Sequence, residues 1–519
     1  MATGTEPYDV LIAGYGPTGM LAAILLGRAG HRVAVIERYK TLYNLPRVGI
    51  VHDDVLRMFQ EIGVIDAILP ATHFLPVYEL ANKGKLLLAN DVAPLATHGW
   101  PEMTSIYQPA FEATLDRTAK ALPSVDVFQG YDITGVAQTD AMVHVTAEDA
   151  QFEGRYLIAC DGGTSFVRQT LGIGLEDLGF DQDWLVIDAA IKKPRPDLPL
   201  LRQFCEIDQP GMTMQMGPDH RRWSFMIFPG EDPRQAIKHE NVWKRLDRAE
   251  GGTPDEFEII RAVSYQFRSL MAERWRQGRI FLAGDAAHQM PPFLAQGMCS
   301  GFRDSYNLAW KLSLVLAGSA SEGILESYEA EREPNARATV IESLRVGQNV
   351  IVRDEAKAAA RDAQLMAMQA AKDNAPGDTA LIAFRVPGLD AGLDAGLIAE
   401  GSAGAGDVFG QGRVQRGAAQ GLFDDIAGHG FMILGRDGDA LPGLTEDEQS
   451  FWAGLGGGSA HFGGPDGLTD LGGGVTQLMD ALGANIVIKR PDHYIYGAGS
   501  GGAGLSALLS QLKNQIGGQ

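Results

Sequence analysis

The sequence predicts an α/β protein with a parallel sheet, an antiparallel sheet inserted into it, and a smaller domain at the C-terminus. Three observations predict this fold class. Residues 8–37 read as strand, glycine turn, helix and strand, residues 184–229 alternate apolar and polar side chains, and glycine becomes frequent after residue 374. The chain has 519 residues, which is enough for about three domains.

The first elements form a strand–helix–strand unit. Residues 8–13 (YDVLIA) are the short apolar run of a buried parallel strand, and the glycine turn at 14–19 leads into an apolar helix. Residues 32–37 (RVAVIE) form the second strand and complete the unit. Apolar residues three and four positions apart predict helices over 53–69 and 109–122, and further strands are expected at 85–89, 125–129, 142–146 and 156–159.

The middle of the chain leaves the parallel sheet and then returns to it. The alternating segment 184–229 predicts antiparallel strands, in which Met212–Met216 are expected as core. Residues 280–283 (IFLA) predict a buried strand, and helices are expected over 301–317 and 322–372. In the C-terminal region we expect strands at 430–434, 485–489 and 494–496 and a helix at 503–512.

These elements predict a division of the chain into domains. We expect a discontinuous first domain at 1–180 and 265–373, an inserted sheet domain at 181–264 with part of 74–105, a linker at 374–415, and a C-terminal domain at 416–519.

Composition and charge exclude several classes of function. Hydrophobic residues make up 45% of the chain and charged residues 21%, which is typical of a globular protein. No run approaches the ~18 apolar residues of a membrane span, and the N-terminus shows no leader, so a cytoplasmic protein is expected. The net charge of −21 is opposite in sign to that of proteins that bind nucleic acids or anionic membranes. Neither is expected as a partner.

Cysteine usage and motif searches exclude other kinds of site. Cys160, Cys205 and Cys299 are far apart in sequence and predict neither a disulfide framework nor a zinc ribbon. The chain has no H-E-x-x-H, Walker A or G-x-S-x-G motif. No metal site is expected.

The glycine turn predicts a dinucleotide site. Gly14 makes the tight turn, Gly16 lets the backbone approach a pyrophosphate, and Gly19 allows the helix to pack closely on the strand. Glu37 ends the second strand, where a carboxylate can bind a ribose hydroxyl. The complete context favours binding of an ADP moiety over a glycine turn without a ligand.

Two aspartates follow predicted strands. Asp161 lies in the CDGG stretch after the strand at 156–159, and Asp285 lies in the GDAAH stretch after the strand at 280–283. Side chains at the carboxyl ends of parallel strands point into the ligand crevice. Each carboxylate can bind sugar hydroxyls or hold a loop.

The combination of these motifs resembles the class A FAD-dependent aromatic hydroxylases, and among them the 3-(3-hydroxyphenyl)propionate hydroxylases. It consists of GYGPTG with Glu37, ACDGG at 159–163 and the long run from GDAAHQMPPF to NLAWKL at 284–312. The similarity extends through 45–50, 106–109 and 228–231 and covers roughly residues 7–350. It implies a Rossmann-like FAD-binding domain of the p-hydroxybenzoate-hydroxylase type with an inserted antiparallel substrate domain and a thioredoxin-like C-terminal domain. That domain would lack redox activity, because no cysteine follows Cys299.

The resemblance also implies the reaction. Non-covalently bound FAD, reduced by NADPH or NADH, would react with O₂ to give a C4a-hydroperoxyflavin that hydroxylates a phenolic ring in aromatic catabolism. A hydroxylase of polyketides or heteroaromatics and a non-catalytic flavin-binding scaffold remain alternatives. A homodimer is a further expectation.

The family pattern assigns roles to individual residues. Cofactor contacts are expected from Gly14, Gly16, Pro17, Thr18, Gly19, Glu37, Arg38, Arg47, Gln108, Asp161, Gly162, Gly284, Asp285, Pro292, Gly297, Met298 and Cys299. Catalytic roles are assigned to Asp161, His288 and Pro292, with anchoring of the loop as the alternative for His288. Substrate contacts are expected from His52, Phe228, Tyr265 and Arg268. Cys299 stands where the family usually has asparagine, which puts one flavin contact in doubt.

Overall fold

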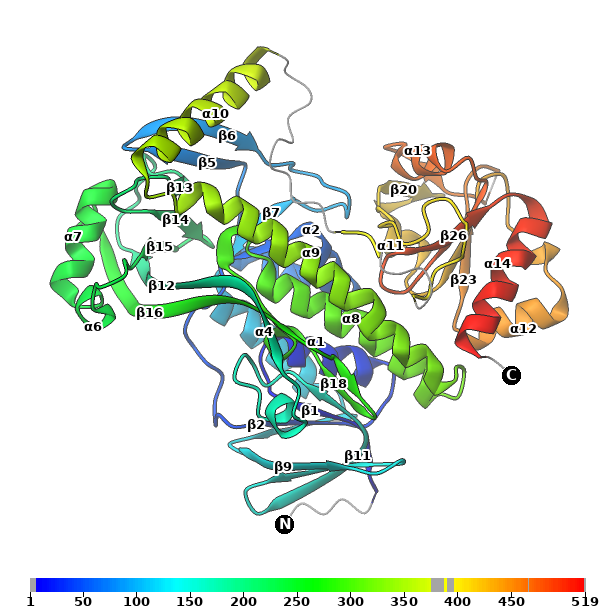
Figure 1. The fold of residues 1–519 in the computed structure, drawn as a ribbon. Helices are drawn as coiled ribbons and strands as arrows, with labels where there is room; N and C mark the ends of the chain where they lie inside the picture. The colour runs from blue at the N-terminus through cyan, green and yellow to red at the C-terminus, as the bar shows by residue number, and fades with distance from the viewer. Residues whose placement is uncertain (1–5, 375–386, 390–395, 465, 518–519) are drawn as a thin grey trace.

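The computed structural model describes residues 6–374, 387–389, 396–464 and 466–517 (Figure 1). Its first sheet confirms the predicted strand–helix–strand unit, because β1 pairs in parallel with both β2 and β11. The strand order is β17-β18-β11-β1-β2-β8, with β10 and β9 continuing from β11. The strands are β1 (Tyr8–Ala13), β2 (Val33–Glu37), β8 (Val125–Gln129), β9 (Ile133–Gln138), β10 (Val143–Ala147), β11 (Ala150–Ala159), β17 (Arg276–Gln277) and β18 (Ile280–Leu282).

The second sheet confirms the predicted antiparallel segment. Its order is β19-β16-β12-β15-β14-β13-β5-β6, and Figure 1 shows β12 and β16 running from this sheet toward the first one. One face packs around Trp223 and Phe225 against α6 (Pro233–Ala236) and α7 (His239–Glu250). The other face packs in part against a small sheet and α10 (Glu355–Asn374), and in part borders a cavity. The strands are β5 (Val77–Asn82), β6 (Lys85–Asp91), β12 (Leu175–Ile191), β13 (Leu201–Phe204), β14 (Gly211–Met216), β15 (His220–Met226), β16 (Phe257–Ala272) and β19 (His288–Gln289).

Helices and a small sheet complete this part of the molecule. Two predicted helices are split: the 53–69 segment turns at Gly63, where φ is +73°, and the 322–372 segment is interrupted at 351–354. α1 packs against α4 and α8, and α8 lies beside α9 (Figure 1). The helices are α1 (Pro17–Arg28), α2 (Asp53–Glu61), α3 (Ile65–Ile68), α4 (Gln108–Lys120), α5 (Phe166–Thr170), α8 (Gln296–Leu316), α9 (Glu326–Val350) and α10 (Glu355–Asn374). The small sheet contains β3 (Ile50–His52), β7 (Met103–Ile106) and β4 (Thr72–Phe74).

The C-terminal region has its own sheets and core. One sheet has the order β23-β22-β25-β26 and the other β21-β20-β24. Residues 375–386 and 390–395 of the expected linker lie outside the described residues, while Leu397 and Phe409 within it are buried in the fold. The elements are β20 (Arg413–Arg416), β21 (Ala419–Leu422), α11 (Phe423–Ala427), β22 (Met432–Gly435), α12 (Glu446–Gly454), β23 (Gly458–His461), β24 (Thr469–Asp470), α13 (Gly474–Ala481), β25 (Ile486–Lys489), β26 (Ile495–Gly499) and α14 (Gly501–Ile516).

Across the described ranges, no helix is both long enough and apolar enough to cross a bilayer.

Candidate active site

A narrow crevice of about 170 Å³ opens at the carboxyl ends of β1, β2 and β11. This edge of a parallel sheet is where nucleotides bind. Several residues that the sequence assigns to a cofactor lie in its walls: Gly14, Gly16, Glu37, Arg38, Arg47, Asp161 and Gly162.

The backbone of the glycine turn leaves room for a ligand. Gly14 has a φ of +95°, and a Cβ there would lie 2.4 Å from the carbonyl oxygen of Cys160. A Cβ on Gly19 would lie 2.2 Å from the Gly14 carbonyl oxygen. Gly16 differs, because no described atom lies within 4 Å of its Cβ position. α1 begins directly after Gly16, which offers no capping side chain, so the first N–H groups of this helix can bind an anion.

Glu37 holds its carboxylate at the wall of the crevice. Its Oε2 accepts a hydrogen bond from the Tyr15 N–H at 2.7 Å, and its Oε1 accepts one from the Tyr39 N–H at 2.8 Å. A carboxylate oxygen can accept more than one hydrogen bond. Both oxygens can therefore also accept from the hydroxyls of a ribose.

Asp161 combines a structural contact with an unused oxygen. Its Oδ2 accepts a hydrogen bond from the Val167 N–H at 3.0 Å, at the start of α5. Its Oδ1 is buried and has no hydrogen-bond partner among the described residues. Burial raises the pKa of Asp161, and hydrogen bonds from Ser165 and Val167 oppose this shift. Asp161 lines the crevice, and a ligand hydroxyl that reached Oδ1 would be a suitable donor.

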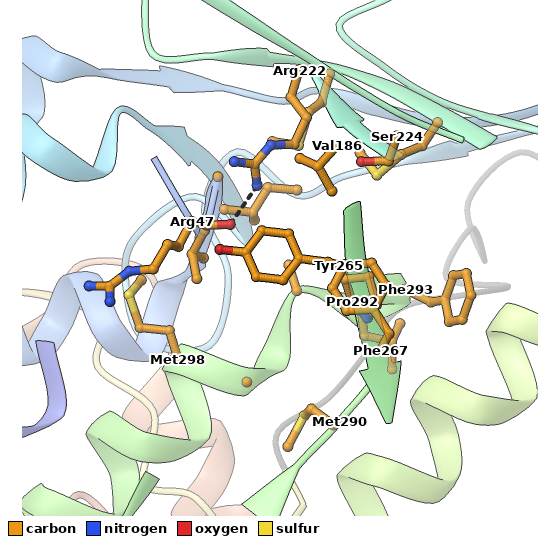
Figure 2. Close-up of a pocket in the computed structure, with 18 of the residues that line it drawn as sticks. Arg47, Val186, Arg222, Ser224, Tyr265, Phe267, Met290, Pro292, Phe293 and Met298 are labelled. Atoms are coloured by element: carbon orange, nitrogen blue, oxygen red, sulfur yellow. Dashed lines mark hydrogen bonds between the residues drawn. The ribbon is translucent and has the colours of Figure 1, made fainter. Parts of the chain in front are cut away.

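A larger cavity of about 370 Å³ lies between the second sheet and the start of α8 (Figure 2). Figure 2 shows Val186 and Ser224 on the sheet side and Pro292 and Met298 on the other. Arg47 lines both the crevice and the cavity, so the two spaces meet beside it. The apolar part of the wall consists of Val48, Ile50, Met103, Val186, Leu201, Met212, Met214, Phe267, Met290, Pro292, Phe293, Leu294 and Met298.

The loop that carries Arg47 is held from two sides. The side-chain oxygen of Gln108 accepts hydrogen bonds from the N–H groups of Arg47 and Val48, at 2.9 and 2.6 Å. From the sheet, Arg222 donates to the Arg47 carbonyl oxygen at 2.6 Å (Figure 2). Asp188 fixes Arg222 through hydrogen bonds of 2.6 and 3.1 Å. These contacts fix the boundary between the crevice and the cavity.

Asp285 and His288 follow the same strand but have different surroundings. Asp285 lines the large cavity, where its side chain is open to the cavity space while the surrounding protein desolvates the carboxyl group and raises its pKa. His288 is only 1% exposed, and its Nε2 lies 2.7 Å from Oδ2 of Asp304. Asp304 also accepts hydrogen bonds from the Gly284 N–H and from Nε of Arg332, at 2.9 and 3.0 Å. His288 therefore anchors the turn after β18.

The first turn of α8 lies against the cavity. Ala295, the residue before the helix, has a φ of +56°, a region that favours glycine. Gly297 and Met298 line the cavity. Cys299 does not, because its side chain is fully buried in the core with Sγ 3.7 Å from the Ala295 carbonyl oxygen.

Comparison with protein families gives two matches. The FAD binding domain family matches residues 7–343, and the HcaD C-terminal domain family matches residues 406–515.

Two relatives extend over nearly the whole chain. A protein from Rhodococcus jostii (strain RHA1) named probable NADH-specific resorcinol 4-hydroxylase is 39% identical, over 98% of this chain and 95% of that protein. A 3-(3-hydroxy-phenyl)propionate/3-hydroxycinnamic acid hydroxylase from Burkholderia vietnamiensis is 31% identical, over 94% of this chain and 93% of that protein. The chain belongs to the FAD-dependent aromatic hydroxylases.

The hydroxylase also resembles solved flavoprotein structures. The flavin-dependent monooxygenase PieE, solved with FAD and substrate, has a TM-score of 0.81 at 19% identity and covers 99% of this chain and 100% of its own. Aklavinone-11 hydroxylase has a TM-score of 0.80 at 22% identity with the same coverage. These similarities confirm the FAD-binding fold.

The structure brings some expected substrate residues of the hydroxylase together and separates others. Tyr265 and Arg268 line the large cavity. His52 instead lies beside a void of about 30 Å³, where burial lowers its pKa to about 4. Phe228 lies against the guanidinium of Arg353, 4.3 Å from it. Neither His52 nor Phe228 is among the residues that line the large cavity, and a substrate contact by either residue stays a prediction.

Some residues of the hydroxylase that were expected to contact the cofactor support the lining residues and do not line the crevice or the cavity themselves. Thr18 packs on Gly284, where a Cβ would lie 2.9 Å from Thr18 Oγ1. Gln108 shapes the Arg47 loop, and Cys299 is turned into the core. A flavin contact at residue 299 stays a prediction, in which the backbone rather than the buried side chain would make the contact.

Sequence reasoning missed the sheet wall of the hydroxylase's cavity. Met214 and Met216 are buried in the core, as expected, and Met212 and Met214 also line the cavity together with Gln203 and Ser224. Alternation along a strand shows that its two faces differ. It does not show which face borders a ligand.

The residues present in the hydroxylase fit FAD. The space beside Gly16 is open, Asp161 has a buried oxygen without a partner among the described residues, and Arg47 lines both the crevice and a cavity suited to a ring. An extended dinucleotide needs this combination of an anion site, hydroxyl acceptors and an apolar end.

Proposed function

We propose that this hydroxylase uses NADH and O₂ to add a hydroxyl group to a small, uncharged phenol of the resorcinol type. Its 39% identical relative carries resorcinol and NADH in its name. The observation that carries the proposal is the mainly apolar cavity of about 370 Å³ that adjoins the nucleotide crevice. The flavin ring would occupy part of this space, and the whole volume is near the lower end for ligand pockets, so the space that remains favours a single ring over a polyketide.

Within this proposal, the chain binds and orients the cofactor. Bound FAD would supply the redox chemistry that couples oxidation of NADH to the use of O₂. The glycine turn and the first N–H groups of α1 would hold the pyrophosphate, and Glu37 the adenosine ribose. Asp161 and Asp285 would accept hydrogen bonds from ribityl or ribose hydroxyls. The first turn of α8, after Pro292, would face the electron-rich edge of the reduced ring, since a helix N-terminus stabilises negative charge.

The remaining residues of the cavity would exclude water and fix geometry. Phe267, Phe293 and Leu294 form an apolar wall, which protects a reactive centre from solvent. His288 acts through the turn that it anchors, so we assign it a positioning role. Arg38, Gly162, Gly297 and Met298 are proposed as cofactor contacts because they line the two spaces.

We also propose the domain division predicted from the sequence, with a thioredoxin-like C-terminal domain. The strand order β23-β22-β25-β26, with β22 and β23 parallel and β25 antiparallel to β22, supports this assignment. Without a cysteine after Cys299, that domain has no thiol for redox chemistry. A homodimer and a cytoplasmic location stay predictions.

The test is substrate-dependent turnover. Purified protein reconstituted with FAD should oxidise NADH faster when resorcinol is added, with O₂ consumed and benzene-1,2,4-triol formed. NADH oxidation that yields only hydrogen peroxide, for every phenol tested, would contradict the proposal. A preparation that does not take up FAD would contradict it at an earlier step.

A further inference from the structure

One row of side chains crosses the sheet wall of the large cavity. The strand registers place Gln203 opposite Met212, Met212 opposite Ser224, and Ser224 opposite Val186. Directly opposed residues of antiparallel strands point to the same face, and all four line the cavity. Gln203 and Ser224 are therefore polar groups in an otherwise apolar row, one on either side of Met212.

These polar groups are buried and have few partners. Gln203 is 3% and Ser224 is 5% exposed, and within the described ranges the Ser224 hydroxyl makes no hydrogen bond. Burial raises the pKa of the neighbouring Tyr78, and a hydrogen bond with the Gln203 amide opposes this shift. Gln203 and Ser224 line the cavity, so a ligand that pairs their remaining donors and acceptors gains affinity.

The cations of the wall are engaged elsewhere. Arg222 is bound by Asp188 and donates to the carbonyl oxygens of the Arg47 loop. The Arg47 side chain donates to Glu112 at 2.9 Å. Arg268 is exposed and donates to Gln266 at 2.6 Å. A carboxylate beside Gln203 would therefore lose water without gaining a free cation, which is costly.

We propose that Gln203, with the Tyr78 hydroxyl beside it, binds a second hydroxyl group of an uncharged phenol, that Ser224 adds a polar contact on the other side of Met212, and that this wall selects against a charged side chain. Amide and hydroxyl groups both donate and accept, so they match a ring hydroxyl in either role. This inference rests on the proposed function, because it concerns the substrate of the same cavity.

The experiment measures the affinity of two ligands for each of two variants and a control variant. Dissociation constants for resorcinol and phenol are measured by calorimetric titration of the FAD-loaded protein without NADH, so the readout does not depend on turnover. Gln203→Met should weaken resorcinol binding about tenfold or more and phenol binding less than about twofold. Ser224→Ala should act in the same direction. Met212→Leu, between them in the row, is the matched control and should change both ligands equally.

A charged ligand tests the selectivity. Wild-type protein should bind 3-(3-hydroxyphenyl)propionate at least about tenfold more weakly than resorcinol, and Gln203→Arg should narrow this difference. Equal losses for phenol and resorcinol in Gln203→Met, or no binding of resorcinol by the wild type, would overturn the inference. So would wild-type binding of the propionate as tight as that of resorcinol. A third outcome separates the two proposals. If Gln203→Met weakens resorcinol binding more than phenol binding, but the wild type does not hydroxylate resorcinol, the inference stands and the proposed function is contradicted.

Discussion

The large cavity and the junction between α2, α8, α9 and the C-terminal region both bury many polar groups, but these groups differ in what they contact. In the cavity, Gln203 and Ser224 face open space. At the junction, the side chains of Arg57 and Asp424 are fully buried and joined by hydrogen bonds of 2.6 and 3.0 Å. Polar groups that face open space are available to a ligand, whereas groups that satisfy each other hold the fold.

A second cluster at the junction shows the same pairing. Glu331 of α9 accepts hydrogen bonds from Lys311 of α8 at 2.7 Å and from Arg490 at 2.8 Å. It also accepts one from the Leu397 N–H at 2.6 Å. Burial alone would raise the pKa of Glu331, but the two cations hold it well below its usual range. The junction is therefore an internal ion network that connects the cofactor half to the C-terminal region.

The largest effect is expected from breaking that network at Arg57. Arg57→Met removes the guanidinium and leaves Asp424 buried with Lys489 3.6 Å and His493 3.9 Å away, so we expect a loss of about 3–5 kcal/mol in unfolding free energy. Chemical denaturation measures it. The matched control is Arg436→Met, which breaks a partly exposed pair with Asp480 and should cost less than about 1 kcal/mol. Equal losses of unfolding free energy in the two variants would mean that the buried pair at the junction stabilises the fold no more than the partly exposed pair does.

A ligand-specific effect is expected at Gly16. Gly16→Ala meets no described atom within 4 Å, so the stability of the FAD-free protein should stay within about 0.5 kcal/mol. The added methyl fills space that the pyrophosphate needs, and the FAD dissociation constant should rise about 10- to 100-fold. Gly443→Ala, also without a close neighbour in the described part of the chain, should change neither quantity. Unchanged FAD binding in Gly16→Ala would remove the turn from the cofactor site.

A pH-dependent effect is expected at Asp53, which borders the junction. Burial, with a further contribution from Asp54, raises the pKa of Asp53 to about 7, so ionising it destabilises the fold as pH rises from about 4 to 7. Asp53→Asn keeps an acceptor for the His98 N–H at 2.9 Å and removes the charge. We expect the variant to be about 1 kcal/mol more stable than wild type at pH 8 and equal to it at pH 4.

Asp54 provides the opposite case. Burial would raise its pKa, but Arg303 donates to it at 2.6 Å and holds the pKa below its usual value. Asp54→Asn should therefore lose stability, and more at pH 8 than at pH 4. Parallel pH profiles for the two variants would contradict both assignments.

The nucleotide crevice could be predicted from the sequence because its signals are local. The glycine turn, the strand that precedes it and Glu37 lie within 30 residues, and the structure places them together at one sheet edge. The cavity wall could not be predicted in the same way. Gln203 and Ser224 come to lie in one row, on either side of Met212, only through the register of three strands, and alternation does not show which face borders the ligand.

The junction was beyond sequence reasoning for a different physical reason. Arg57 and Asp424 are 367 residues apart, and neither stands in a motif. From sequence alone each is expected to be a charged residue at the surface. An ion is buried only where it has a partner, and the local sequence does not show that partner. His52 and Phe228 lie outside the lining of the large cavity for a related reason, since the sequence of a segment does not show the direction of its side chains.

The smallest effect is expected at Cys299, which tests the boundary between wall and core at adjacent residues. Its thiol is fully buried and turned toward the Ala295 carbonyl, while Met298 lines the cavity. Cys299→Ala should lower the unfolding free energy by about 1 kcal/mol and leave the FAD dissociation constant within about twofold. Met298→Ala should weaken FAD or substrate binding more than Cys299→Ala does, because it removes apolar contact inside the cavity. Fluorescence titration of FAD into each apoprotein compares the two. A larger loss of FAD affinity in Cys299→Ala would mean that residue 299 reaches the flavin after all and that the helix turns when the cofactor binds.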